Sequence, residues 1–171
     1  MSSTIGVQNI AHTDGTVAAT VSSGGAVYIK DHVLQVKSYP LATALQTQST
    51  TYVTTGLTLS ITPQSTSSKI LIRFIIPSYI NASNYRLYLT LFRGTVSGTN
   101  LATSPSTAFA DLRISNGGEV NTVLSGEFLD SPSTSSSVTY TVGYKVNTSA
   151  AVGGVFRESI QGNITLMEIG G

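Results

Sequence analysis

The feature that most constrains the fold is a two-residue alternation of apolar and polar side chains, which recurs from about residue 50 to the end of the chain. It is clearest in residues 138–146, where Val138, Tyr140, Val142, Tyr144 and Val146 alternate with smaller or polar residues. Successive side chains of a strand point to opposite faces of the sheet. The segment therefore predicts a strand with one face, including both tyrosines, in a core.

Further segments with strand-like composition lie between clusters of Gly, Ser, Asn and Pro, which favour turns. They cover residues 57–62, 69–77, 86–93, 110–115, 120–129 and 163–169, with a short candidate at 155–158. In 69–77 both alternating sets are apolar, because Leu71 and Ile75 lie opposite the main set. This pattern predicts a central strand covered on both faces. The run Asn116-Gly117-Gly118 predicts a tight hairpin after residue 115.

No stretch of the chain has a helical pattern, so we expect an all-β fold, an antiparallel β-sandwich or jelly roll with an extended N-terminal β-arm. A length of 171 residues suits one sandwich of ~100–140 residues plus an arm. We expect residues 1–36 to form an attachment or oligomerisation arm and residues 37–171 to form the sandwich. The arm has too little apolar mass for a core, so it must pack on the main domain, on sister copies or on a host surface.

Composition argues against several classes of partner. Charged residues make up 10% of the chain, against ~25% in an average domain, and the formal net charge is +1 with no basic run. Nucleic acid and anionic membranes are therefore unexpected partners. No apolar stretch reaches the ~18–20 residues of a membrane span, and the N-terminus does not resemble a signal peptide. Ser and Thr, more than a quarter of the residues, supply the polar surface instead.

Several segments resemble a β-sandwich module of tail-fibre-like and other virion-surface proteins of tailed bacteriophages. In the sandwich region they are SITPQSTSSKILI (60–72), LFRGT (91–95), FLDSPSTSSSVTYTVGY (128–144) and ITLMEIG (164–170). The arm segments IGVQNIAHTDGT (5–16), SSGGAVYI (22–29) and HVLQV (32–36) resemble the lead-in that precedes this module. The resemblance covers most of the chain, although its motifs consist mainly of turn and core residues.

The resemblance implies a virion structural protein, commonly a trimer, with the N-terminal part attached to the particle and the sandwich displayed outward. It implies assembly in the host cytoplasm and contact with capsid, collar or tail proteins. No extended repeat separates arm from sandwich. That departure favours a short head or neck fibre, a fibre tip or a decoration protein over a long host-reaching fibre.

The sequence does not predict catalysis, a cofactor or a metal site. His12 and His32 stand beside Asp14 and Asp31 in the arm, and they are more simply turn or surface residues than ligands. Two of the carboxylates of Glu119, Glu127 and Asp130 would be needed for an acid/base pair, but solvation of hairpin edges explains these residues better. No G-x-S-x-G motif is present. We therefore do not expect an enzyme.

Binding of a host glycan is the alternative function. A tyrosine ring offers an apolar face to a sugar, and its hydroxyl can form a hydrogen bond. Tyr79 and Tyr85 lie in the segment SYINASNY (78–85), which reads as a loop, and they are the candidate glycan-binding residues. Arg86 and Arg93 are candidates for binding an anionic ligand, although ordinary ion pairs explain them more simply.

Overall fold

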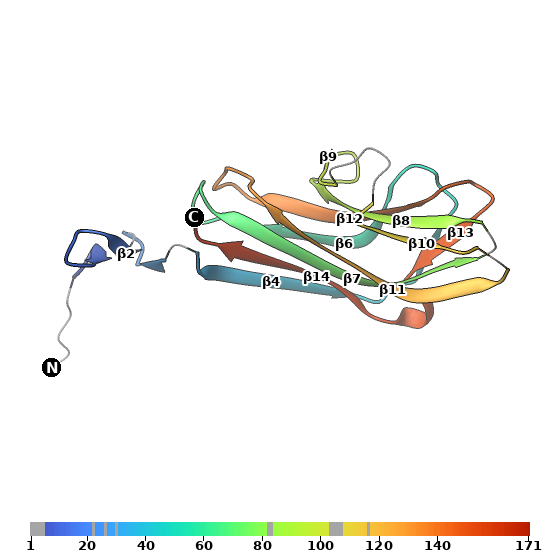
Figure 1. Cartoon of the computed structure of the whole chain (residues 1–171), viewed down its shortest axis with the longest axis horizontal. Coiled ribbons are helices and arrows are strands. Elements are labelled where there is room, and N and C mark those ends of the chain that lie inside the picture. The colour runs from blue at the N-terminus through green and yellow to red at the C-terminus, as the bar shows by residue number, and fades with distance from the viewer. Residues whose placement is uncertain are drawn as a thin grey trace.

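The structure, a computed structural model, describes residues 6–21, 23–25, 27–29, 31–81, 84–102, 108–115 and 117–171. In these residues, strands pair into a three-stranded, a five-stranded and a six-stranded sheet, and all of their strand pairs are antiparallel. The two larger sheets pack face to face, and the small sheet projects from one end (Figure 1). The predicted fold class, an all-β antiparallel sandwich or jelly roll with an extended N-terminal β-arm, is confirmed.

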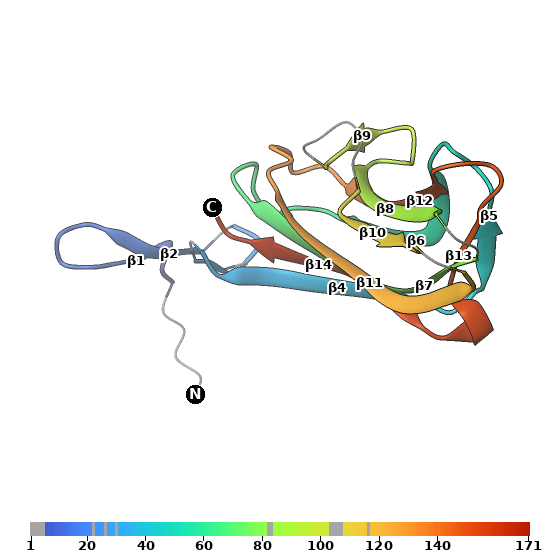
Figure 2. The ribbon, with the colours of Figure 1, turned by 45° about the vertical axis from the view of Figure 1, so that its right-hand side comes forward.

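The projecting sheet consists of β1 (Asn9–Ala11), β2 (Val17–Val21) and β3 (Val27–Tyr28), and we call it the arm sheet. The turn between β1 and β2 is closed by a hydrogen bond from the Gly15 amide to the His12 carbonyl, with Gly15 at a φ of 88°. Two further bonds hold the base of the arm: the Asp31 amide donates to the Gly170 carbonyl, and the Gly170 amide donates to the His32 carbonyl. Figures 1 and 2 both show the arm extending away from the sandwich and not folding back onto it.

The six-stranded sheet, here called the β7 sheet, is built around one long central strand. On one side of β7 (Lys69–Asn81) lies β11 (Glu119–Asp130), which pairs with it along its length. On the other side β14 (Gly162–Ile169) pairs with the first half of β7 and β13 (Val152–Val155) with the second half. The outer strands are β4 (Val33–Leu41), next to β14, and β5 (Leu45–Thr47), next to β13.

The five-stranded sheet, here called the β12 sheet, faces it. Its strands are β10 (Ala110–Arg113), β8 (Arg86–Arg93), β12 (Val138–Val146) and β6 (Val53–Ile61) in that order, with β9 (Thr99–Asn100) beside β8. A short 3₁₀ turn, η1 (Arg157–Ser159), follows β13. The core lies between the sheets and includes Tyr140 and Tyr144, which are almost fully buried as predicted.

Strand β7 continues through Pro77 for four residues beyond the predicted end, which corrects the prediction of a loop at 78–85. The reason lies in its neighbours: β14 pairs with β7 as far as Ile75, and β13 begins to pair at Ser78. The Pro77 carbonyl accepts a hydrogen bond from the Phe156 amide on this side of the strand. Because the N and O of one strand residue point the same way, the missing N–H of Pro77 faces the gap between β14 and β13, where no ladder bond is lost.

Three other predictions of local structure do not hold within the single chain. Residues 110–115 and 120–129 do not form a hairpin, because β10 pairs with β8 and β11 pairs with β7 in the opposite sheet. The connection is a corner between sheets, and its residue Asn116 lies outside the described residues. The candidate strand at 155–158 is the end of β13 followed by η1. Finally, β7 is central but is covered on one face: Ile75, on the outer face, is 39% exposed.

Candidate functional site

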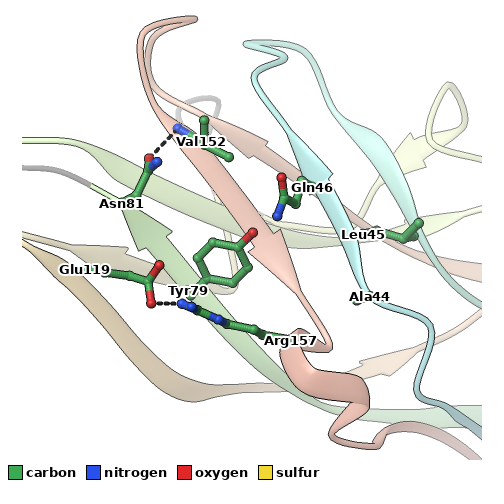
Figure 3. Close-up of a pocket in the computed structure, with 8 residues that line it drawn as sticks. All are labelled: Ala44, Leu45, Gln46, Tyr79, Asn81, Glu119, Val152 and Arg157. Atoms are coloured by element: carbon green, nitrogen blue, oxygen red, sulfur yellow. Dashed lines mark hydrogen bonds and ion pairs between the residues drawn. The ribbon is translucent and has the colours of Figure 1, made fainter.

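A pocket of about 420 Å³ (Figure 3) opens at the end of the β7 sheet where β5 and β13 lie, which is the end away from the arm (Figure 2). Four strands and η1 contribute to it, with Gln46 from β5, Tyr79 from β7, Glu119 from β11, Val152 from β13 and Arg157 from η1. Ala44, Leu45 and Asn81 complete its lining. Polar groups of several kinds thus converge on one concave surface, as is typical of ligand sites.

Tyr79 forms the floor of this pocket and is only 5% exposed. One side of its ring packs over Gly154, its neighbour in β13; a Cβ atom at Gly154 would lie 2.1 Å from the ring. The guanidinium of Arg157 lies 5.0 Å from the ring centroid, within the range of a cation–π contact. Burial raises the pKa of Tyr79, while Arg157 and a hydrogen bond with Gln46 act in the opposite direction. The ring is therefore held between glycine backbone and guanidinium.

Arg157 is positioned by a backbone of unusual conformation. Phe156, Glu158 and Ser159 all have φ between 55° and 58°, in the left-handed region that non-glycine residues rarely adopt. Residues held in this way cost of order 1 kcal/mol or more each, and they concentrate at binding sites. The Arg157 side chain pairs with Glu119 across the pocket (Figure 3). The pocket therefore holds a nearly neutral guanidinium–carboxylate pair.

Amide groups supply the remaining polar surface. The exposed Gln46 reaches the Tyr79 hydroxyl from β5, and the Asn81 side-chain oxygen accepts a hydrogen bond from the Val152 amide at 2.8 Å. Amides, a guanidinium and a carboxylate together offer donors and acceptors to a ligand rich in hydroxyl groups. The described residues contain no cluster of three or more His, Asp or Glu side chains placed to hold a metal ion.

The structure separates the two tyrosines named from the sequence. Tyr79 lines the pocket, whereas Tyr85 does not, and lies half-buried against the core just before β8. Tyr79 is not on an exposed loop, so stacking of a sugar on its free face would require Arg157 to move. Sequence reasoning missed Gln46 and Arg157, which stand in weakly patterned segments. Only the glycine pair 153–154 hinted at a close approach there.

The other candidate groups do not form sites together. Glu119 and Asp130 lie at opposite ends of β11; Glu119 pairs with Arg157, whereas Asp130 is buried and pairs with Arg93. Arg93 thus takes part in an ion pair, as its simpler interpretation predicted. His12 Nδ1 lies 3.2 Å from the exposed Asp14 carboxylate at the arm turn.

Among the described residues, none lies in a helix with the length and apolar character that crossing a bilayer requires.

Comparison with known proteins gives a limited result. No protein-family model matches the sequence, and no curated protein matches it either. Solved structures similar to the chain include the VP2 subviral particle of infectious bursal disease virus, with 10% identity and a TM-score of 0.47 over 85% of this chain and 35% of that chain. The Gx strain of the same virus gives 10% identity and a TM-score of 0.45 over 85% and 34%.

A third structure, the T13 particle of that virus, gives 12% identity and a TM-score of 0.39 over 84% of this chain and 37% of that chain. All three structures come from infectious bursal disease virus. The chain spans about a third of the length of each of them. Likeness of this size adds nothing about activity or partners, and the fold class rests on the strands themselves.

Proposed function

We propose that the chain is a structural protein of a virion, a bacteriophage fibre or decoration protein anchored by its arm and carrying the sandwich outward. The observation that carries the proposal is the arm itself. It is a small sheet that projects from the end of the sandwich, and the apolar side chains of Val7, Ile10, Val17 and Val27 on it are about half exposed. The resemblance of the sequence to virion-surface proteins of tailed bacteriophages supports the same role, and it implies a trimer.

The energetics favour an arm that is completed by a partner. A sheet of this size buries little apolar surface. Among the described residues of the arm, Ala19 is the one apolar side chain that is buried. A sheet this small has only marginal stability in water unless it packs against another element. Covering a half-exposed aliphatic side chain is worth roughly 1 kcal/mol. Burying four such side chains against a protein of the particle would give several kcal/mol of binding free energy, roughly 4 kcal/mol. Binding of many copies at once would strengthen attachment further.

Labelling intact particles tests this proposal. An antibody against the sandwich should decorate the particle surface at the capsid, collar or tail, and the chain should remain with particles through density-gradient purification. Val17→Asp in the arm should prevent incorporation, whereas Thr58→Asp, which introduces the same carboxylate at an exposed strand residue of the β12 sheet, should not. Particles that never carry the chain, or incorporation of both variants alike, would rule out an arm-anchored virion protein.

A second candidate function, recognition of host glycans, is favoured by the pocket around Tyr79. Its converging amides and ion pair suit a ligand rich in hydroxyl groups, and a displayed sandwich would present the pocket away from the arm. Glycan arrays with the full chain should show hits that are lost in Gln46→Ala and in Tyr79→Ala. Tyr39→Ala, an exposed tyrosine outside the pocket, is the matched control. Hits that survive both pocket changes would remove this site from consideration.

A further inference from the structure

The two sandwich sheets differ in the surface they turn outward. Every exposed large apolar side chain in the described residues belongs to the arm, to the β7 sheet or to the turn before β14. The outer face of the β12 sheet differs: Thr58 and Ser60 pair through their hydroxyls with Thr141 and Thr139, and Phe92, the cross-strand partner of Thr141, is only 4% exposed. Among the described residues, this outer face therefore leaves no large apolar side chain exposed, whereas the outer face of the β7 sheet does.

The apolar side chains of the β7 sheet form a row across four strands. Val36, Met167, Leu71 and Leu129 are successive cross-strand partners in β4, β14, β7 and β11. Val36 is 57% exposed and Leu129 is 45% exposed. The sequence pattern of β7 predicted cover on both faces, and the isolated chain provides it on one face only. The arm does not supply the missing layer, because it points away from the sheet (Figures 1 and 2).

We infer that this face is buried against the same face of a second copy of the chain, across a two-fold axis that runs parallel to the strands between β14 and β7. This goes beyond the proposed virion role and does not depend on it. An axis in that position places β4 of one copy over β11 of the other, and β14 over β7. A two-fold interface of this kind brings the same two surfaces together twice.

The register of the strands makes the face complementary to itself in that arrangement. Val36 meets the partner's Leu129, and Met167 meets the partner's Leu71, so the apolar row is covered completely.

The next row carries two charged side chains. It consists of Ser38, Thr165, Arg73 and Glu127. The axis sets Arg73 over the partner's Thr165 and Glu127 over the partner's Ser38, so each of these two charges meets a hydroxyl. The exposed Lys69, two residues before Leu71 on the same face, is set over the partner's Ile169, and no like charges are opposed.

The available area suits a dimer of modest affinity. Four strands about 4.8 Å apart, over about seven residues at about 3.3 Å each, give roughly 900 Å² of flat surface for two copies. Side-chain relief adds to this, which places the contact near the ~1,000 Å² that separates specific interfaces from incidental ones. The pairing gives dimers and not the trimer that the resemblance implies.

Sedimentation analysis of the full chain over a range of concentrations tests the inference. The natural chain should form dimers, and Val36→Asp or Leu129→Asp should each raise the dimer dissociation constant by at least about tenfold, because a carboxylate would be buried against an apolar side chain. Thr58→Asp on the outer face of the β12 sheet and Val17→Asp in the arm should leave the constant unchanged. Both face positions are exposed in the single chain, and circular dichroism will verify that the variants fold.

A charge pair tests the axis itself. Val36→Lys and Leu129→Glu should each weaken the dimer, and the double variant should restore it, since each new lysine faces a new glutamate of the other copy. Within one chain the two positions are three strands apart, roughly 14 Å, so they cannot pair internally. A monomeric or trimeric natural chain, dimers indifferent to the face variants, or a double variant that stays dissociated would each overturn the inference. Absence of the chain from virions would not affect it.

Discussion

The buried carboxylate of Asp130 accepts a hydrogen bond from the hydroxyl of Tyr140 at 2.6 Å, and the two residues belong to opposite sheets of the sandwich. Asp130 ends β11 in the β7 sheet, whereas Tyr140 lies in β12. Arg93, at the end of β8, donates from Nε to the same carboxylate at 2.8 Å and forms a second bond from its terminal nitrogen. Three donors thus neutralise and satisfy one carboxylate that is almost fully buried.

Removing this charge should destabilise the sandwich. Asp130→Asn keeps the shape but leaves the Arg93 guanidinium without its counter-ion and turns an acceptor into a donor. Because Arg93 is partly solvated, we expect a loss of about 2–3 kcal/mol in the free energy of unfolding. Urea denaturation will measure it. Asp111→Asn, an exposed strand residue, is the control and should change stability by less than about 0.5 kcal/mol; equal effects would show that the Asp130 cluster contributes nothing special.

Stability should fall steeply in alkaline solution. Burial is the largest cause that raises the pKa of Tyr52 to about 12 and that of Tyr144 to about 12. Burial and the hydrogen bond to Asp130 also raise the pKa of Tyr140. A group whose pKa is higher in the folded than in the unfolded chain contributes stability below pH ~10 that is lost as pH rises through the folded value. Each tyrosine should therefore cost roughly 1 kcal/mol between pH 10 and pH 11.

Melting temperatures between pH 9 and pH 11.5 check this prediction, with tyrosinate absorbance as a second signal. Tyr144→Phe should make the decline of the melting temperature with pH shallower by about one tyrosine's contribution. A melting temperature that stays level to pH 11.5 would contradict the expected direction of all three pKa shifts.

The sequence was most informative where one face of a strand is buried. The alternation in residues 138–146 places Tyr140 and Tyr144 in the core, and both are there, because a strand that slips by one residue would turn its apolar side chains to solvent. Which strands pair with each other was harder to predict from the sequence. Ala110 to Arg113 carries the same alternation whether it pairs with β8 or with β11, so the corner between the sheets was mistaken for a hairpin.

Local sequence patterns could not predict the pocket, for a different reason. Its residues come from segments far apart in the sequence, and Arg157 reaches Tyr79 through three left-handed residues that no turn motif in the sequence announces. Tyr79 itself was named, but as part of a loop, since Pro77 suggested the end of a strand. Only the gap between β14 and β13 explains why the strand continues.

Four glycines in the strands lie against aromatic rings, and one pair offers a test. They are Gly126 with Phe74, Gly143 with Phe92, Gly154 with Tyr79 and Gly162 with Phe156. In Gly154→Ala the new methyl group would overlap the Tyr79 ring, which is confined by Arg157. We expect a loss of about 2 kcal/mol in the free energy of unfolding. Gly6→Ala, where nothing lies within 4 Å, should be nearly neutral.

A double-mutant cycle identifies the cause of that loss. In a Tyr79→Ala background the clash with residue 154 disappears, so Gly154→Ala should then cost less than about 0.5 kcal/mol, which corresponds to a coupling of more than about 1 kcal/mol. Equal costs in the two backgrounds would mean that the glycine is needed for its backbone and not for the ring above it.

In the turn that carries Arg157, glycine should fit position 158 at least as well as the present glutamate. Glu158 has a φ of 55°, where a residue with a Cβ atom is strained by roughly 1–2 kcal/mol, and its side chain is exposed with only a long contact to Arg157 at 3.8 Å. Glycine relieves that strain but adds roughly 0.5–1 kcal/mol of unfolded-state entropy. We therefore expect Glu158→Gly to leave the free energy of unfolding unchanged or raise it by up to about 1 kcal/mol. Asp111→Gly, in an extended strand, should lower it by about 1 kcal/mol, and a comparable loss in Glu158→Gly would show that the left-handed turn is not where the chain is strained.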